Sequence, residues 1–161
     1  MMPALAIEAG RVAALRSEIG GFQALTKVLT AEADALRRAD AIALLVLAAE
    51  KLEHVASLQA LARQRAQDMQ RAGVANNAAG VQAWLAQAGD AATAHAAWRQ
   101  LTQLALEAKC QNTVNGRLAA RQRWHFDAAL ATLLQAAGVS SVYGADGRAR
   151  RTSFSQGHIT V

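Results

Sequence analysis

Apolar residues recur at helical spacing over most of this 161-residue chain. From Val12 to Leu36 the steps alternate between three and four residues, with one break at Thr26. This heptad spacing is typical of helices that pack nearly parallel or antiparallel to one another. The composition is rich in alanine and leucine, which favour helix, and the only proline is Pro3. The sequence therefore predicts an all-α fold.

Short polar segments divide the pattern into predicted helices at 12–38, 41–71, 81–87 and 91–137. Asp40 is a helix N-cap residue, Gly73 and Gly138 are helix stops, and 76–80 reads as a loop. The connection between the first two helices is so short that they must be antiparallel neighbours. We predict an elongated antiparallel bundle of three long helices plus one short helix over residues 1–138. An irregular C-terminal tail, mobile or extended, follows over residues 139–161.

The second helix is expected to bury one apolar seam against the bundle. The residues of this seam are Leu45, Leu52, Val55, Leu58, Ala62 and Met69. In the first helix, Gly20 and Gly21 interrupt the pattern and indicate a kink, a close approach of another backbone or a tolerated weak spot.

Motifs for catalysis or metal binding are missing from the sequence. A di-iron centre in a helical bundle needs Glu-x-x-His pairs, and no histidine here has a carboxylate three residues before it. Glu50 and His54 share a helix face and read as a solvated pair. Cys110 lies deep in a helix, where we expect a small buried hydrophobic residue. The prediction is a non-enzyme with no metal and no cofactor.

Charge, cysteine content and hydropathy indicate which partners and which cellular compartment to expect. The net charge of +5 permits an acidic partner, but the one basic cluster, Arg148–Arg151, has no interleaved aromatic residues of the kind that stack on nucleotides. The single cysteine fits a reducing cytoplasm. The most apolar run, Leu44–Ala49, is far shorter than the roughly 20 residues that span a bilayer. No basic residue precedes Arg11, so a secretory signal is not expected. We predict a cytoplasmic protein with no membrane span and no nucleic-acid partner.

Polar residues interrupt the apolar stripe of the longest helix at Asn112, Asn115 and Gly116. Buried asparagines could fix the register of the helices at some cost in stability. Alternatively, the seam is left open for a partner helix, which the missing side chain of Gly116 would let approach closely. Beyond it, an apolar face at helix spacing would receive that helix: Leu118, Phe126, Leu130, Leu133 and Leu134. In the tail, Tyr143 and Gly144 form a turn by composition, and the tyrosine either anchors a second partner or packs back on the bundle.

The chain resembles the FlgN family of flagellar type III export chaperones. The resemblance rests on Asn112–Leu118, Leu130–Leu134, Tyr143–Gly147 and the ending Gly157-His158-Ile159-Thr160-Val161. It implies a helical protein without catalytic activity that works in the cytoplasm. Such a chaperone binds hook-associated proteins 1 and 3, keeps their terminal helical segments from polymerising and brings them to the export gate.

The resemblance implies a role for particular residues of this chain. Cargo contact would fall on Asn112, Asn115, Gly116, Leu118, Leu130, Leu133 and Leu134. Tyr143, with Gly144, would dock at the cytoplasmic domain of the export-gate receptor. The alanine-rich stripe and the Arg148–Arg151 cluster depart from the family pattern. Two alternatives stay open, a self-contained coiled-coil adaptor or structural protein and a basic helical nucleic-acid-binding protein. Whether the chain forms a homodimer also stays open.

Overall fold

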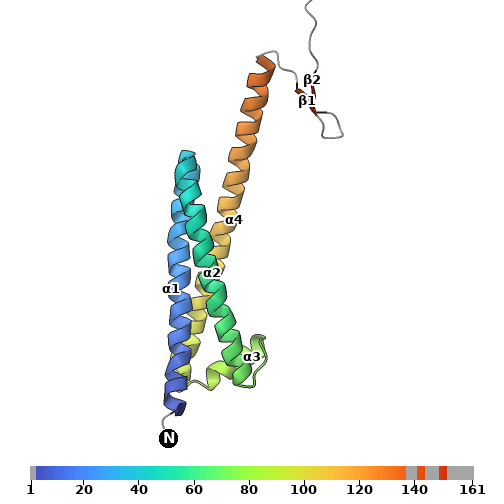
Figure 1. Ribbon diagram of the computed structural model, residues 1–161. Coiled ribbons are helices and arrows are strands. Elements are labelled where there is room, and N and C mark those ends of the chain that lie inside the picture. The colour runs from blue at the N-terminus through green and yellow to red at the C-terminus, as the bar shows by residue number, and fades with distance from the viewer. Residues whose placement is uncertain (1–2, 137–140, 144–148, 152–161) are drawn as a thin grey trace, which may run out of the picture. The chain divides into compact units, whose positions relative to one another are not determined.

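The computed structural model describes the backbone of residues 3–136, 141–143 and 149–151 and the side chains of residues 10–136. It contains three long helices and one short helix: α1 (Pro3–Arg38), α2 (Ala41–Arg71), α3 (Ala78–Ala86) and α4 (Ala91–Ala136) (Figure 1). The first two run antiparallel to each other. The predicted all-α antiparallel architecture is confirmed. The chain divides into two compact units, Met1–Ala119 and Ala120–Val161, and α4 contributes to both.

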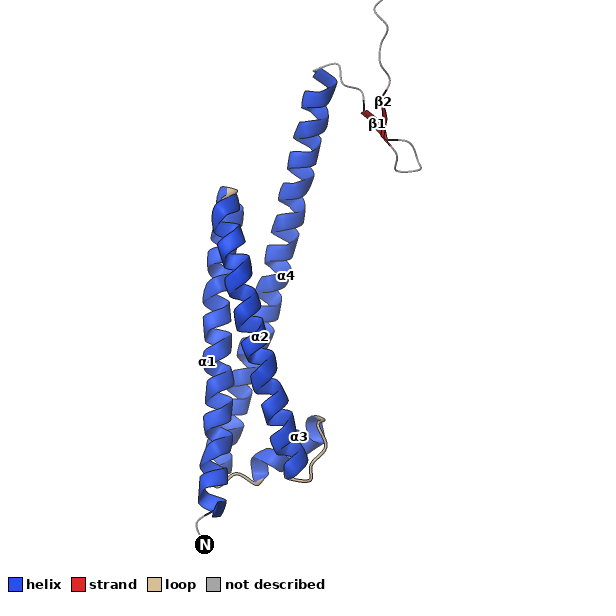
Figure 2. Ribbon diagram, in the orientation of Figure 1, coloured by secondary structure: helices blue, strands red, loops and turns tan. Residues whose placement is uncertain are grey.

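Two short strands follow the helices in sequence (Figure 2). The strands β1 (Ser141–Tyr143) and β2 (Ala149–Arg151) pair antiparallel, with Val142 opposite Arg150. The prediction of an irregular tail did not include this pair. Residues 137–140, 144–148 and 152–161, and with them much of the predicted tail, lie outside the described residues.

The end of α1 is closed by two backbone hydrogen bonds that are typical of a Schellman motif. The N–H of Ala39 donates to the carbonyl of Leu36 at 3.1 Å, and the N–H of Asp40 donates to that of Ala35 at 3.0 Å. Ala39 adopts a left-handed conformation, with φ of 53°. Asp40 then caps α2, because its side chain accepts a hydrogen bond from the Ala43 N–H at 3.0 Å.

The end of α2 repeats this arrangement with a glycine at the left-handed position. Gly73 has φ of 72°. Its N–H donates to the backbone carbonyl of Gln70 at 3.0 Å, and the N–H of Val74 donates to that of Met69 at 3.1 Å. Gly73 is therefore the helix stop that the sequence predicted.

The start of α3 was placed too late by the sequence. The prediction had a loop at 76–80, but the helix begins at Ala78 because Asn77 caps it, accepting a hydrogen bond from the Gly80 N–H at 2.8 Å. At the start of α4, Asp90 caps the helix in the same way through the Thr93 N–H at 2.9 Å. Hydrogen bonds from the Thr93 side chain and backbone lower the pKa of Asp90 below its usual value.

The core of the Met1–Ala119 unit has two clusters of buried residues at two levels along the helices. The larger cluster brings α3 and the start of α4 against α1 and the end of α2, and it consists of Leu15, Ile19, Met69, Val81, Trp84, Leu85, Ala88, Ala94, Ala97 and Leu101. The smaller cluster consists of Leu25, Leu29, Leu58 and Ala108. Burial of these side chains is what holds the three long helices together.

A buried ion pair links the three long helices beside this core. Glu18 on α1 is almost fully buried and accepts a hydrogen bond from Nε of Arg65 on α2 at 2.8 Å. The Arg65 guanidinium also lies over the ring of Trp98 on α4, 5.0 Å from its centroid. The Arg65 guanidinium therefore neutralises the Glu18 carboxylate in a position that water hardly reaches, and the Trp98 ring adds a cation–π contact.

The predicted seam of α2 is only partly correct. Leu58 and Met69 are buried, but Leu45 and Leu52 are exposed. The first half of α2 contacts α1 through a different set of residues, including Leu47 and Lys51, so the leucines of the predicted seam face away. Of the two glycines in α1, Gly21 lies against α2: a Cβ there would come within 2.8 Å of the Leu58 side chain.

Candidate partner-binding face

Asn115 is the last buried residue of α4, and the protein itself uses its amide. Its Nδ2 donates to the Leu29 carbonyl at 2.7 Å and to Oε2 of Glu32 at 2.8 Å, both on α1. Its Oδ1 is buried and accepts no hydrogen bond within the described part of the chain. An amide bonded in this way fixes the register of α4 against α1.

Further polar contacts surround Asn115 and join all three long helices. Lys51 on α2 donates to Oε1 of Glu32 at 2.5 Å and lies 3.4 Å from Oδ1 of Asn112. Gln111 donates to the hydroxyl of Thr30 at 2.9 Å. Asn112 itself is exposed. Of the two asparagines, one is therefore committed to the interior, whereas the other remains accessible at the surface.

Beyond Asn115, the apolar stripe of α4 continues but is no longer buried. Leu118 is half-buried, and all residues from Arg123 to Ala136 are exposed. The exposed fractions are 64% for Phe126, 55% for Leu130, 67% for Leu133 and 36% for Leu134. We call these four residues the α4 apolar face. They follow Asn115 at spacings close to multiples of a helical turn, so they continue the side of α4 that is buried before it.

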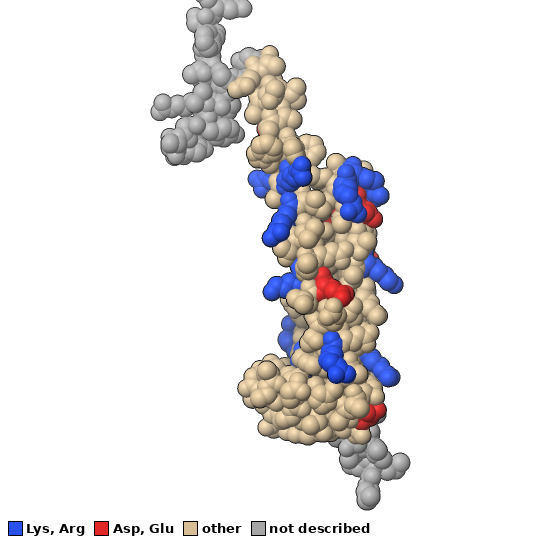
Figure 3. Space-filling view, turned by 180° about the vertical axis from the view of Figure 1, so that it is seen from behind, with Lys and Arg blue, Asp and Glu red and all other residues tan. Residues whose placement is uncertain are grey.

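The end of α4 also lacks charge. From Ala128 to Ala136 the helix contains no charged residue, although all of its side chains are exposed. On the face that Figure 3 shows, the Lys and Arg side chains of the described residues are spread out rather than gathered into one patch. A long, uncharged and exposed helical surface is typical of a protein-binding site and not of a nucleic-acid interface.

Gly116 lies just after the last buried residue and has open space beside it. A Cβ at this position would meet no atom within 4 Å in the described structure. Glycine in a helix lowers stability by roughly 1 kcal/mol relative to alanine. No described neighbour lies close enough to explain why a side chain is missing at this position.

Sequence reasoning missed several exposed apolar residues. Trp124 is exposed on the side of α4 opposite Phe126, with its ring 5.0 Å from that of His125. The prediction for Cys110 was wrong: it is exposed, because the residues that face α1 from α4 are its neighbours at other helical positions, such as Ala108. Helical phase relative to Leu101 and Ala108 would have indicated this.

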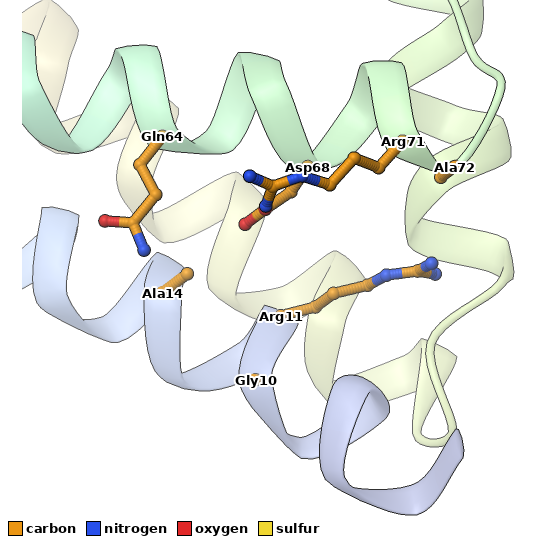
Figure 4. Close-up of a pocket in the computed structure, with 7 residues that line it drawn as sticks. All are labelled: Gly10, Arg11, Ala14, Gln64, Asp68, Arg71 and Ala72. Carbon is orange, nitrogen blue, oxygen red and sulfur yellow. The ribbon is translucent and has the colours of Figure 1, made fainter. Parts of the chain in front are cut away.

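A pocket of about 500 Å³ between α1 and α2 is a weaker candidate (Figure 4). Its lining includes two arginines that already have partners. Nη1 of Arg71 bonds to Asp68 at 2.8 Å, and Nη1 of Arg11 donates to the Trp84 carbonyl at 2.9 Å. Arg71 is therefore paired with a carboxylate, whereas Arg11 is held by a neutral carbonyl and keeps its positive charge.

The remaining predicted sites give no sign of metal chemistry. Glu50 and His54 lie 3.9 Å apart at the surface, as expected for a solvated pair. The described residues contain no group of three or more possible metal ligands. For Tyr143 the structure describes only the backbone, in β1, and Gly144 lies outside the described residues. No helix in the described ranges is long and apolar enough to cross a membrane.

Comparison with known proteins assigns the chain to a family. One family model, described as FlgN protein, matches residues 12–151, whereas no curated protein and no solved structure matches. The match covers most of the chain, including the polar interruption of α4 and the α4 apolar face. Proteins of this family are chaperones without enzymatic activity, which confirms the prediction that the chain is not an enzyme. The chain belongs to the FlgN family of flagellar export chaperones, which bind hook-associated proteins.

Proposed function

We propose that the α4 apolar face binds the helical terminal segments of hook-associated proteins 1 and 3. The observation that carries this proposal is the change in burial along one side of α4. The same side that packs into the core up to Asn115 leaves Phe126, Leu130 and Leu133 in solvent. Exposed apolar residues at helical spacing are the usual receptor for an amphipathic helix. A self-contained coiled coil would instead bury them.

The residues before the α4 apolar face have distinct parts in this proposal. Asn115 holds α4 against α1 through Leu29 and Glu32 and so positions the helix without leaving the interior. Asn112 is exposed and can exchange hydrogen bonds with a cargo backbone. Gly116 and Leu118 begin the contact surface, where the missing side chain lets a cargo helix come close.

If the α4 apolar face covers the terminal helices of the cargo, the protein acts as a chaperone by blocking polymerisation. The terminal helices of a filament-forming protein are its polymerisation surfaces, and a helix held on the α4 apolar face is unable to pair with another cargo molecule. We place this activity in the cytoplasm, before export. Delivery would follow when Tyr143 and Gly144 dock at the cytoplasmic domain of the export-gate receptor.

The test is to change Leu130 and Leu134 together to aspartate and to titrate the protein with the C-terminal fragment of a hook-associated protein. Burial of one leucine contributes about 2 kcal/mol. Loss of both should weaken binding by about a thousandfold, since each tenfold change corresponds to about 1.4 kcal/mol.

The matched control is Ala128→Asp with Ala131→Asp. These two alanines are exposed on the other side of the same helical segment. The control variant adds the same charge and should bind cargo almost as well as the unchanged protein. Melting curves of both variants test whether the bundle is intact. Equal affinity of both folded variants for cargo would place the cargo site elsewhere.

A further inference from the structure

The helices α2 and α4 run antiparallel in a register that two contacts fix (Figure 2). The guanidinium of Arg65 lies over the ring of Trp98, and Nζ of Lys51 donates to Oδ1 of Asn112 at 3.4 Å. Arg65 and Lys51 are 14 positions apart on α2, and Trp98 and Asn112 are 14 positions apart on α4. One step back along α2 therefore corresponds to one step forward along α4.

The seam between these two helices is packed around Val55 and Ala108, and its α2 side is uncovered beyond them. Val55 packs against the smaller core cluster, which includes Ala108. Leu52, Ala48 and Leu45 precede Val55 by 3, 7 and 10 residues, so they lie on the same side of α2. We call these three residues the α2 strip. All three are exposed, Leu52 by 69% and Leu45 by 76%.

The α4 side of the same seam is exposed as well. Asn112, Gly116 and Ala119 follow Ala108 by 4, 8 and 11 residues and share its side of the helix. All three are exposed, and a Cβ at Gly116 would meet no atom within 4 Å in the described structure. In the register of the two contacts, Gly116 and Ala119 lie level with residues 44–47 of α2. Within the described part of the chain, neither helix covers the other here.

The α4 apolar face is small for a site that must hold a partner protein. Complete burial of a large apolar side chain removes roughly 100 Å² of apolar surface from water. Four such residues give roughly 400 Å², about half of the roughly 800 Å² that each partner contributes to a standard interface. A chaperone of hook-associated proteins therefore needs contact area beyond this face.

We propose that a helix of the hook-associated protein packs in the open seam, with the α2 strip as a second wall of the cargo site. This inference rests on the proposed function and adds a surface on α2 to it. On α4 the seam leads to the α4 apolar face, since Phe126 follows Ala119 by seven residues, or about two helical turns. No charge occurs over Ala41–Ala49, which suits the apolar side of a cargo helix, and Gly116 lets that helix come close.

Titration with the C-terminal fragment of a hook-associated protein tests the proposal. Leu45→Asp with Leu52→Asp puts two charges into the seam that cargo would fill. Binding should weaken by about a hundredfold or more, because the complex loses two buried leucines and would bury two carboxylates. The free protein should melt as before, since both leucines are exposed in it.

Ile42 and Val46 provide the matched control on the same segment of α2. They precede Val55 by 13 and 9 residues, which places them on the opposite side of the helix. Their exposed fractions are 79% and 63%. Ile42→Asp with Val46→Asp therefore adds the same charge at similarly exposed positions, and cargo affinity should stay within about twofold of that of the unchanged protein.

A dye placed in the seam gives a readout that does not depend on a loss of affinity. Cys110 is the only cysteine of the chain, so Cys110→Ser provides a background for labelling one chosen position. A solvatochromic dye on Leu45→Cys should shift its emission to the blue when cargo is added, because cargo removes it from water. The same dye on Ile42→Cys should keep its emission.

The outcomes separate this inference from the proposed function. If Leu130→Asp with Leu134→Asp weakens cargo binding while the α2 variant and the dye at position 45 behave like their controls, the α4 apolar face stands and the second wall is overturned. If only the α2 variant loses cargo, the seam is supported and the α4 apolar face is not the cargo site. Self-association that Leu45→Asp with Leu52→Asp abolishes, with cargo affinity unchanged, would assign the seam to a second copy and overturn its role for cargo.

Discussion

At the scale of single residues, two left-handed positions carry out the same task with different side chains. Ala39 and Gly73 both close a helix through a Schellman motif, with φ of 53° and 72°. An L-residue with a Cβ pays about 1 to 2 kcal/mol in this conformation, whereas glycine does not. The end of α1 is therefore less favourable than the end of α2.

We expect Ala39→Gly to stabilise the protein by about 0.5 to 1 kcal/mol, because the relief of strain exceeds the extra entropy that glycine has in the unfolded chain. Gly73→Ala is the mirror-image control and should destabilise by a similar or larger amount. Urea unfolding monitored by circular dichroism measures both. A loss of stability on Ala39→Gly would contradict the strain at this turn.

Gly116 is a second position where a single side chain matters. Gly116→Ala should stabilise the free protein by about 0.5 to 1 kcal/mol, since a Cβ there meets no described atom and alanine favours helix. The same substitution should weaken cargo binding measurably if cargo approaches closely at this point. Gly20→Ala in α1, an exposed helical glycine with equally open surroundings, should raise stability alike and leave cargo affinity unchanged. Identical cargo affinity for the two variants would remove Gly116 from the contact surface.

At the scale of helices, packing depends on a polar contact as well as on apolar clusters. The Glu18–Arg65 pair joins α1 to α2 at a nearly dry position, and Trp98 of α4 covers the guanidinium. Such a pair gives little net stability over apolar residues of the same size, but loss of one partner leaves a buried charge uncompensated.

We therefore expect Arg65→Met to destabilise the protein by about 3 to 5 kcal/mol, because the Glu18 carboxylate then stays buried without its cation. The double variant Glu18→Leu with Arg65→Met should recover most of this loss, since it removes the orphaned charge and retains the volume. Thermal and urea unfolding give both values. If the double variant were no more stable than Arg65→Met alone, lost packing rather than the buried charge would be the cause.

At the scale of the whole molecule, the buried core and the exposed apolar face of α4 belong to different units of the chain. All residues of the two core clusters lie in the Met1–Ala119 unit, whereas the α4 apolar face and both strands lie in the Ala120–Val161 unit. The proposed cargo-binding face therefore lies in a different part of the sequence from the core clusters, and we expect substitutions to separate cargo binding from folding stability.

Tyr143 belongs to the second unit and provides a test of this separation. Tyr143→Ala should leave the melting temperature and cargo affinity nearly unchanged and should reduce binding to the cytoplasmic domain of the export-gate receptor. Pull-down or calorimetric titration with that domain, alongside a cargo titration, measures the two properties. A melting temperature lowered by several degrees would instead make the tyrosine a structural contact.

The sequence by itself determined where α1 and α2 end and where α2 begins, because the signals that start and stop a helix are local. Asp40 and Gly73 act within three residues of themselves, and both were identified from the sequence. Asn77 acts in the same way, and α3 was placed too late only because Asn77 was read as part of a loop.

Only the tertiary structure decided which side of each helix is covered. The sequence assigned Leu45 and Leu58 to one apolar seam of α2, yet one is exposed and the other is buried. Periodicity identifies an apolar side but carries no information on how many helices cover it or where their contacts end. The same limit applies to α4, where Asn115 is bonded to α1 while Phe126, eleven residues later on the same side, is exposed. Burial is a property of contacts between segments distant in sequence, and these depend on the packing of the whole bundle.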